Sequence, residues 1–406
     1  MCYFTQLIAY KIPGAEKSRQ FYKKQAFMKA DQLLFQQEKW EGLDQLHYPP
    51  EDYQLLLLFA DKKWLLNPEM IHSLRQLFPH STIVSSSTAG EIYNGAGHEG
   101  SAVCIPVHFD HTRFEVACDQ LDHFPGSFEL GQALAGQLSR KDLSYAFLIS
   151  DGHIVNGSDL IAGIMDILGN EIPISGGMAG DGSKFSETIT GVNENLGQGY
   201  VILIGFYGNR LQVGISVQRG FTFLGPERIV TRSDKNILYD IDGKNALELY
   251  KTYLGKYSEE LPGSALLFPI AIIGESNAEP LVRTILSINE AEGSMIFAGN
   301  LPEGSRIRLM HSNLNHLIEY AREGGKQSSN RFMHPPALAL VMNCVGRKTI
   351  LQSRKNEEIE ELTKVFDRQT MVAGFYTYGE FSSWENPAKV CDLHNQTVVV
   401  TVLDEL

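Results

Sequence analysis

Apolar runs separated by polar turns organise the first half of this chain and predict a mixed α/β protein. The run Tyr53 to Ala60 predicts a strand. Asn67-Pro68 then supplies a helix N-cap with proline at the first helical position, and Pro79 closes that helix after Phe78. A further strand and a strand pair follow, over 82–86, 102–109 and 114–121. Together these elements form a strand-helix-strand-turn-strand-strand unit.

The same order returns ninety positions later, which indicates an internal duplication. The segment Ser87-Thr88-Ala89-Gly90-Glu91 has its counterpart at Gly177-Met178-Ala179-Gly180-Asp181, and Asp61 at a strand end has its counterpart at Asp151. An offset held without a gap across strand, helix and turn indicates a true repeat. We place the two copies at about 53–125 and 145–220 and expect both turns to face a common pocket. The second copy's elements are expected over 145–149, 159–168, 172–175, 200–207 and 211–218.

The pattern changes after Arg228 to short strands with polar connections, which predicts a second domain. Near its end the order recurs a third time, with longer spacing and few identities, and again places an acid after glycine at Gly379-Glu380. The fold class is therefore α/β (mixed α+β), with duplicated units forming layered sheets with helices and a C-terminal α/β domain. We expect a helical lead-in over 1–52 containing an amphipathic helix over 15–37, domains over 53–227 and 228–406, and an exposed loop over 323–330.

Composition narrows the class of partner. The 406 residues are 43% apolar and 20% charged, and their net charge is −13. An acidic chain without a long basic run is a poor match for nucleic acid or for an anionic membrane. The five cysteines form no CxxC pair, which is typical of a reducing compartment, and no secretory signal or membrane span is evident. We expect a cytoplasmic protein.

The repeated turns are the first candidate site. Glycine after a strand brings backbone close to a neighbour, either to pack two units together or to bind a ligand with N–H groups, helped by the hydroxyls of Ser87 and Thr88. The turn lacks the Gly-Lys-Ser/Thr of a Walker loop, so nucleotide binding is not indicated. Glu91, Asp181 and Glu380 could surround a shared pocket or cap the next element, but no nucleophile with a recognisable partner accompanies them. We expect a binding protein rather than an enzyme.

Two other positions could carry chemistry. His153 follows Asp151-Gly152 at a strand end, where α/β proteins commonly bind ligands, although a surface loop histidine has the same appearance. A b-type haem held by one histidine leaves almost no mark in a sequence. Cys344 lies near the cation of Arg347, which could lower the pKa of the thiol, or it could simply be a packing residue.

Taken together, these motifs resemble the FIST family, a sensory module with an N-terminal FIST domain and a C-terminal FIST-C domain. The resemblance extends from about Tyr53 to the end. The motifs that carry it are Ser87-Thr88-Ala89-Gly90-Glu91, Asp151-Gly152, Ser175-Gly176-Gly177-Met178-Ala179-Gly180-Asp181, Asp242-Gly243, Cys344-Val345-Gly346-Arg347, Gly374-Phe375-Tyr376-Thr377-Tyr378-Gly379-Glu380 and His394-Asn395-Gln396-Thr397.

The resemblance implies a stand-alone bacterial sensor of a small ligand. Its preferred specific case is a haem-based nitric-oxide sensor of the NosP type that regulates a histidine kinase or other signalling protein, with His153 as axial ligand and His394 and His98 as rivals. The alternatives are a haem-free receptor for an amino acid or similar metabolite and, third, an enzyme using Cys344 or the repeated acids. A homodimer is among the expected assemblies. The expected ligand-binding residues are Ser87, Thr88, Gly90, Glu91, Asp151, Gly177, Gly180, Asp181, Arg347, Tyr376 and Glu380.

Overall fold

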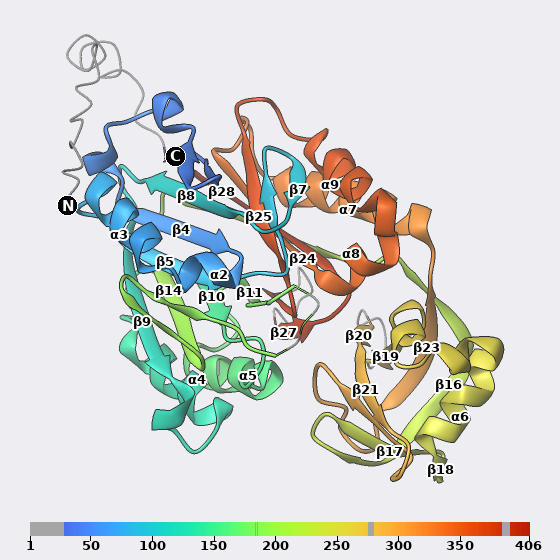
Figure 1. Cartoon of the computed structure of the whole chain (residues 1–406). Helices are drawn as coiled ribbons and strands as arrows, with labels where there is room; N and C mark the ends of the chain where they lie inside the picture. Colours follow the sequence, from blue (N-terminus) through green and yellow to red (C-terminus); the bar gives the residue numbers. More distant parts are fainter. Residues whose placement is uncertain (1–27, 183, 185, 275–279, 384–389) are drawn as a thin grey trace, which may run out of the picture.

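Three sheets packed around one core form the body of the protein, and a smaller region extends from it. The computed structural model describes residues 28–182, 184, 186–274, 280–383 and 390–406. The body holds one sheet for each recurrence of the sequence pattern, while residues 221–312 build the smaller region (Figure 1). This arrangement confirms the predicted mixed α/β class. Within the described residues, no helix combines the length and apolar character that crossing a membrane requires.

Each sheet of the body is built on the same three strands. In the first, β4 (Leu55–Ala60) pairs parallel with β5 (Thr82–Ser87) and antiparallel with β8 (Ala102–His108). In the second, β10 (Leu143–Ser150) makes the same pairings with β11 (Ile174–Met178) and β14 (Tyr200–Tyr207). In the third, β24 (Leu338–Cys344) makes them with β25 (Met371–Thr377) and β28 (Val398–Glu405). The duplication is therefore real, and the third recurrence is a third structural copy.

Each copy contributes edge strands to the sheet of a neighbouring copy, so that the three copies are linked in a closed cycle. A hairpin from each copy joins the neighbouring sheet: β6–β7 (Glu91–Tyr93, Ala96–His98) joins the third, β12–β13 (Thr190–Val192, Asn195–Gly197) the first, and β26–β27 (Glu380–Ser383, Cys391–His394) the second. On the opposite edges, β9 (Arg113–Gln120) pairs with β14 and β15 (Leu211–Gln218) pairs with β28. Because each sheet borrows strands from another copy, the three cannot separate without breaking main-chain hydrogen bonds.

Strand alternation divides each sheet between two cores. Leu57 and Phe59 of β4 point into a central core shared with Phe147 and Ile149 of β10 and with the corresponding side chains of β24. The alternate residues of each strand face that sheet's own helices. These helices are α3 (Pro68–Leu77) for the first sheet, α4 (Ser127–Gln137) and α5 (Gly157–Leu168) for the second, and α7 (Leu314–Ser329) and α9 (Lys355–Thr363) for the third. A strand that is buried on both faces has a continuous apolar sequence, and β4 and β10 have such sequences.

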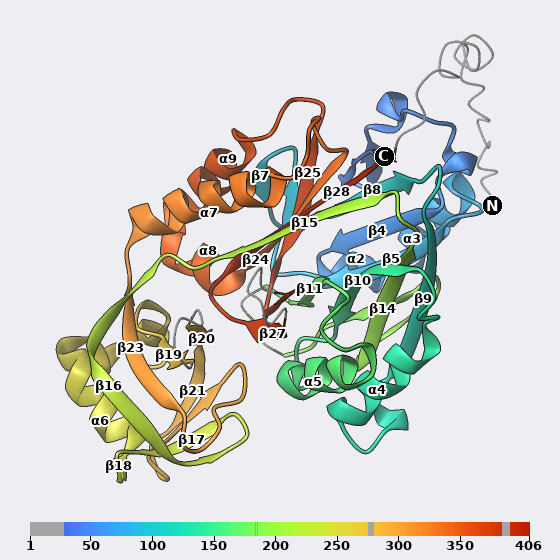
Figure 2. The ribbon, with the colours of Figure 1, turned by 180° about the vertical axis from the view of Figure 1, so that it is seen from behind.

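The smaller region has its own core and lies beside the second sheet. The long strand β16 (Phe221–Asp234) leads into it and β23 (Arg306–Ser312) leads back, and the two pair with each other. Helix α6 (Ala246–Leu254) packs inside it against residues such as Leu238 and Phe297. From both sides of the molecule, β21 (Ile285–Asn289) lies on the flank that faces β27 and α5 (Figures 1 and 2). Strand β16 runs through the domain boundary predicted at 227/228.

Two predicted elements are wrong. The helical lead-in is contradicted over 28–41, where β1 (Lys29–Ala30), β2 (Leu33–Gln36) and β3 (Lys39–Glu41) occur; residues 1–27 lie outside the described part. The physical reason is the open edge of β8, which β2 fills as β9 and β15 fill the other two sheets. The exposed loop predicted over 323–330 belongs instead to α7, where Gly324 and Gly325 are buried against Gln218 and Val365.

Candidate functional site

The three turns meet at the centre of the body and bond to one another through their backbones. The Gly180 N–H donates to the Ser87 carbonyl at 3.0 Å, which joins the second turn to the first. The Ala89 N–H donates to the Tyr376 carbonyl at 2.9 Å, and the Met178 N–H donates to the Gly379 carbonyl at 2.8 Å. These bonds close a ring of three turns. The predicted proximity of the first two turns is correct, and the third turn joins them.

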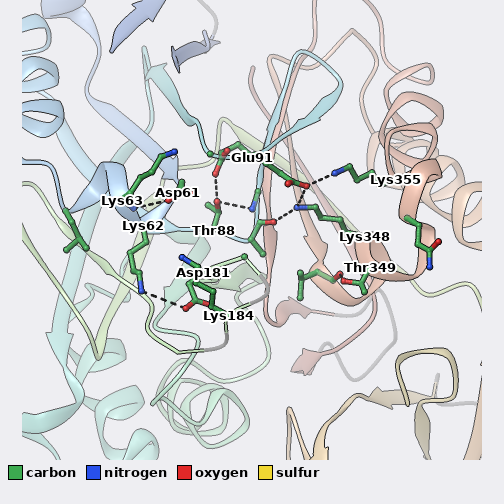
Figure 3. Close-up of a pocket in the computed structure, with 18 residues that line it drawn as sticks. Asp61, Lys62, Lys63, Thr88, Glu91, Asp181, Lys184, Lys348, Thr349 and Lys355 are labelled. Atoms are coloured by element: carbon green, nitrogen blue, oxygen red, sulfur yellow. Dashed lines mark hydrogen bonds and ion pairs between the residues drawn. The ribbon is translucent and has the colours of Figure 1, made fainter. Parts of the chain in front are cut away.

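A cavity of about 600 Å³ opens beside this ring, between the first copy and the third (Figure 3). Its floor is the first turn, Thr88 to Glu91, with Asp181 and Gly182 from the second turn beside it. One wall is α2 (Lys62–Leu65), which follows β4 directly and is N-capped by Asp61. The facing wall is α8 (Val345–Leu351), which follows β24 directly. Strand-to-helix junctions from two copies therefore enclose the space, as is common for ligand sites in α/β proteins.

Five lysines and four carboxyl residues line this cavity. Lys348 is held most firmly: its Nζ lies 2.7 Å from the Ala89 carbonyl and 2.9 Å from Glu99, and its side chain is 13% exposed. Lys62 lies across the cavity, with its Nζ 3.0 Å from Glu187. The lysines are Lys62, Lys63, Lys184, Lys348 and Lys355, and the acids are Asp61, Glu91, Glu99 and Asp181. Figure 3 shows Lys348 and Lys355 opposite Lys62 and Lys63.

Three of these carboxyl groups have shifted pKa values, and the shifts differ in direction. Burial raises the pKa of Glu91 to about 7, although hydrogen bonds from Ser101 and Thr88 oppose that rise. Burial also acts to raise the pKa of Asp181, but hydrogen bonds from Tyr378, Glu187 and Ser186 outweigh it and hold that pKa at about 2. Hydrogen bonds from Lys355 and then Lys348 lower the pKa of Glu99 to about 2. At neutral pH the cavity therefore has more positive than negative groups.

Gly90 is required where it stands. Its φ is +129°, a conformation that side chains rarely adopt, and an added Cβ would come within 2.9 Å of both the His98 carbonyl and Lys348 Nζ. The glycine thus lets β7 and Lys348 approach the floor of the cavity. The sequence prediction that glycine permits a close approach is explained by these two neighbours.

Four of the predicted ligand residues line the cavity: Thr88, Gly90, Glu91 and Asp181. The others lie in the frame around it. Ser87 accepts a bond from the Ile189 N–H, and Asp151 accepts from the N–H groups of His153, Ile154 and Gly199. Gly177 pairs with Glu380 between β11 and β26, and Gly180 contacts Ala89. These residues position the turns and do not face the cavity.

Arg347, Tyr376 and Glu380 are fully buried and do not line the cavity. Arg347 is fully buried, pairs with Glu358 and donates to the Leu317 carbonyl at 2.8 Å. The Tyr376 ring lies under Lys348, whose Nζ is 5.0 Å from the ring centroid. Glu380 accepts from Thr377 and Thr397 just as Glu91 accepts from Thr88 and Ser101, and burial raises the pKa of Glu380 to about 8. The same acid site thus occurs twice, once beside the cavity and once away from it, and both carboxyl groups are buried.

The histidines and Cys344 are placed less favourably for the chemistry expected of them. His153 is exposed at the rim of a different cavity, His98 lies in β7 beside Tyr93, and His394 is fully buried with its Nε2 3.3 Å from the Ser382 carbonyl. None of the described residues lining the large cavity is a histidine. Among the described residues, no three His, Cys, Asp or Glu side chains are grouped to hold a metal ion. Burial raises the pKa of the Cys344 thiol well above its usual range, so the expected activation by Arg347 is outweighed.

The lysines were missed by the reasoning from sequence. Lys62 and Lys63 follow Asp61 at the position where the second copy has Gly152 and His153. The sequence interpretation selects only His153 of these residues as a candidate ligand. Alignment of the two copies would have marked both lysines as residues at the carboxyl end of a strand. Lys348 and Lys355 belong to the third copy, which lies far from the first turn in the sequence. Their position beside that turn becomes visible only in the folded chain.

Comparison with known protein families finds matches in both halves of the chain. A model described as the FIST N domain matches residues 54–244, and one described as the FIST C domain matches residues 246–383. An uncharacterized protein of Methanocaldococcus jannaschii is 20% identical over 327 residues, which is 73% of this chain and 61% of that protein. The chain thus spans less than two thirds of that relative's length.

Among solved structures, a cyanuric acid hydrolase from A. caulinodans covers 92% of this chain and 99% of its own, at 8% identity and a TM-score of 0.34. A second cyanuric acid hydrolase structure covers 93% of this chain and 99% of its own, at 7% identity and a TM-score of 0.32. Similarity at this level supports no argument about shared fold or chemistry.

Proposed function

The chain belongs to the FIST family, whose domains are associated with small-ligand sensing in signalling, and we propose that it senses an amino acid or a similar metabolite in the lysine-lined cavity. The observation that carries this proposal is the mixture of ammonium and carboxyl groups around one space of about 600 Å³. Pockets of this size take small metabolites. A ligand with a carboxylate and an ammonium group could satisfy both kinds of charge at once.

The lysines supply the attraction for the ligand's carboxylate. Lys62 and Lys348 approach from opposite walls and are each largely shielded from solvent, with side chains 18% and 13% exposed. A charge-assisted hydrogen bond at a shielded site is stronger than at the surface. Both lysines are already oriented by protein acceptors, so little ordering remains when a ligand arrives.

A ligand in the cavity would contact all three copies. Its walls are α2 of the first copy and α8 of the third, and Asp181 of the second copy also lines it. A ligand that contacts these elements stabilises their present arrangement over any alternative, which is the requirement for a signal. We propose a histidine kinase or another signalling protein as the reader of that arrangement, as the family resemblance implies.

A binding role is better supported than catalysis. Cys344 is buried with a raised thiol pKa, and Glu380 is sealed by Thr377 and Thr397. Thr88 donates its hydroxyl to Glu91, which itself is held by Ser101. The repeated acids are therefore occupied by neighbouring hydroxyl groups.

The haem-based nitric-oxide case is less well supported. A b-type haem needs an axial histidine opening onto an apolar pocket, and the described residues of the large cavity offer charged groups instead. The second cavity, which His153 borders, has a volume of about 280 Å³. The charged lining of the first cavity and the small volume of the second do not fit the group. An absorption spectrum after haem reconstitution tests this directly: we expect no Soret band, and a band lost in His153→Ala would restore the haem sensor.

The proposal is tested by calorimetric titration of the purified protein with the twenty amino acids and their deaminated analogues. We expect at least one carboxylate-bearing compound to bind, and Lys348→Gln to weaken it. Lys326→Gln is the matched control, because Lys326 is paired with Glu323 on the exposed face of α7. If no compound binds, or if both variants bind equally well, the lysine cavity is not the sensor site.

A further inference from the structure

A second cavity of about 280 Å³ lies where the second copy meets the smaller region. On the side of the body it is lined by 152–156, Met178 and Tyr378. On the side of the smaller region it is lined by Asn236, Leu286 and 297–299. It is separate from the lysine cavity, since the two have no lining residue in common.

The body wall of this cavity is the duplicate of a wall of the lysine cavity. Subtracting ninety from Gly152, His153 and Met178 gives Lys62, Lys63 and Thr88, all of which line the first cavity. Both walls begin directly after the first strand of a copy, β4 or β10. The second copy thus has a cavity at the same place in the repeat, with lining residues of different chemistry.

That change removes charge. No lysine, arginine, aspartate or glutamate occurs among the described residues that line the second cavity, whereas nine such residues line the first. Uncharged residues replace them, both apolar and aromatic ones such as Leu286 and Tyr378 and polar ones such as Asn156 and Asn236. Burying an unpaired ion against walls without charge is costly, while an uncharged ring gains contact area at the apolar groups and hydrogen bonds at the polar ones.

The walls are fixed in place by bonds between the body and the smaller region. Asn156 donates to Asn300 at 3.1 Å, and Asn300 donates in turn to Asp159 at 2.8 Å. Lys235 pairs with Asp159 at 3.1 Å, and Arg283 donates to the Leu393 carbonyl at 2.7 Å. Cavities whose walls are already ordered bind small molecules at a lower entropic cost.

We propose that this cavity is a second ligand site, which takes a small uncharged aromatic or heteroaromatic molecule. Its volume suits one or two fused rings rather than a drug-sized ligand. His153 at the rim supplies an imidazole for a hydrogen bond to a ring nitrogen or hydroxyl group. The inference does not depend on the ligand of the lysine cavity.

Indole is the probe, and isothermal titration calorimetry on the full chain is the measurement. We expect indole to bind the wild-type protein and indole-3-carboxylate, of similar shape but charged, to bind more weakly. Leu286→Trp fills the cavity and should weaken indole binding roughly tenfold or more. Leu314→Trp is the matched control, because Leu314 is likewise partly exposed but lines neither cavity.

The results separate this site from the first. Loss of indole binding in Leu286→Trp, with its melting temperature and amino-acid binding unchanged, supports the proposal whatever the lysine cavity binds. Absence of indole binding, equal binding by Leu286→Trp, or tighter binding of indole-3-carboxylate would each overturn it. Failure of amino-acid binding alone would overturn only the function proposed for the lysine cavity.

Discussion

The first and second copies share a frame but differ at the point where strand meets helix. After β4 the chain reads Asp61-Lys62-Lys63, and after β10 it reads Asp151-Gly152-His153. Strand pairing is the same in both, and α3 covers the first sheet as α5 covers the second, where α4 packs beside it. The loops face cavities of opposite character, one charged and one uncharged. The two copies agree where strands pair and differ at residues that line the cavities.

Exchanging these two residues should have the largest effect. Lys62→Gly with Lys63→His gives the first copy the sequence of the second and removes two cations from the lysine cavity. Because a charge-assisted bond contributes about 1.5–3 kcal/mol, we expect roughly ten- to hundredfold weaker binding of a carboxylate ligand in titration calorimetry. Indole binding serves as the control and should not change. Unaltered carboxylate binding would mean that α2 does not form a wall of the site.

Placing a side chain at Gly152, as the reverse exchange requires, should destabilise the fold because there is no room for a Cβ. A Cβ on Gly152 would lie 1.9 Å from the Ala179 carbonyl, so Gly152→Ala forces the second turn to move. We expect a loss of about 1–3 kcal/mol in the free energy of unfolding, measured by denaturant titration. Gly136→Ala on α4 is the control, since nothing lies within 4 Å of its added Cβ and alanine favours a helix. Equal stability of the two variants would contradict the packing described for Gly152.

Tyr378 connects the two cavities. It lines the second, and its hydroxyl bonds to Asp181, which lines the first. If both sites bind, indole should change the affinity for the carboxylate ligand, and Tyr378→Phe should remove that change. Coupling between sites is typically about 5–150-fold, and we expect the low end because a single hydroxyl group, bonded to Asp181 and Gly182, is involved. Titration with and without indole measures it; equal coupling in the variant would exclude this hydroxyl group as the connection.

The smallest effect concerns pH. Glu91 has a pKa of about 7 and lines the cavity, so it is neutral below that pH and repels a carboxylate ligand above it. We expect carboxylate binding to weaken a few-fold as pH rises from 6 to 8, within the range of one shielded charge interaction, and Glu91→Gln to flatten the profile. Glu380→Gln is the control, because Glu380 is buried away from the cavity.

Glu380→Gln should instead alter the pH dependence of stability. The folded-state pKa of about 8 lies above the usual value of 4.5, so the folded state holds this proton more tightly. Its contribution to stability is present below pH 4.5 and is lost as pH rises toward 8. The difference in free energy of unfolding between wild type and variant should therefore shift in the variant's favour over that range. A constant difference would contradict the burial of an ionisable group there.

Much of the frame could be predicted from the sequence, because buried strands and capped helices leave strong local patterns. The helix capped by Asn67-Pro68 and the apolar strand ending at Ala60 occur as expected. The pairing at the sheet edges could not be predicted, because it depends on contacts between distant segments. Strand β2, for example, forms where β8 offers an open edge. Gly324 and Gly325 read as a loop, but small residues let α7 pack closely on its neighbours.

The candidate site was only partly predictable for the same reason. Thr88, Gly90, Glu91 and Asp181 were found because the repeated turn marks them. Lys348 and Lys355 come from a copy some 250 residues away and meet the first turn only in the folded chain. Glu380 looks the same as Glu91 in sequence, and only the folded structure shows that Glu91 lines the cavity while Glu380 does not.

One measurement bears most directly on the idea that a repeated frame carries two sites of different chemistry. It is calorimetric titration of the wild type, Lys348→Gln and Leu286→Trp with the amino-acid panel and with indole. The structure predicts that Lys348→Gln loses affinity for the carboxylate ligand and keeps it for indole, and that Leu286→Trp does the reverse. If both variants lose both ligands, or neither loses either, the two cavities are not separate sites of opposite chemistry.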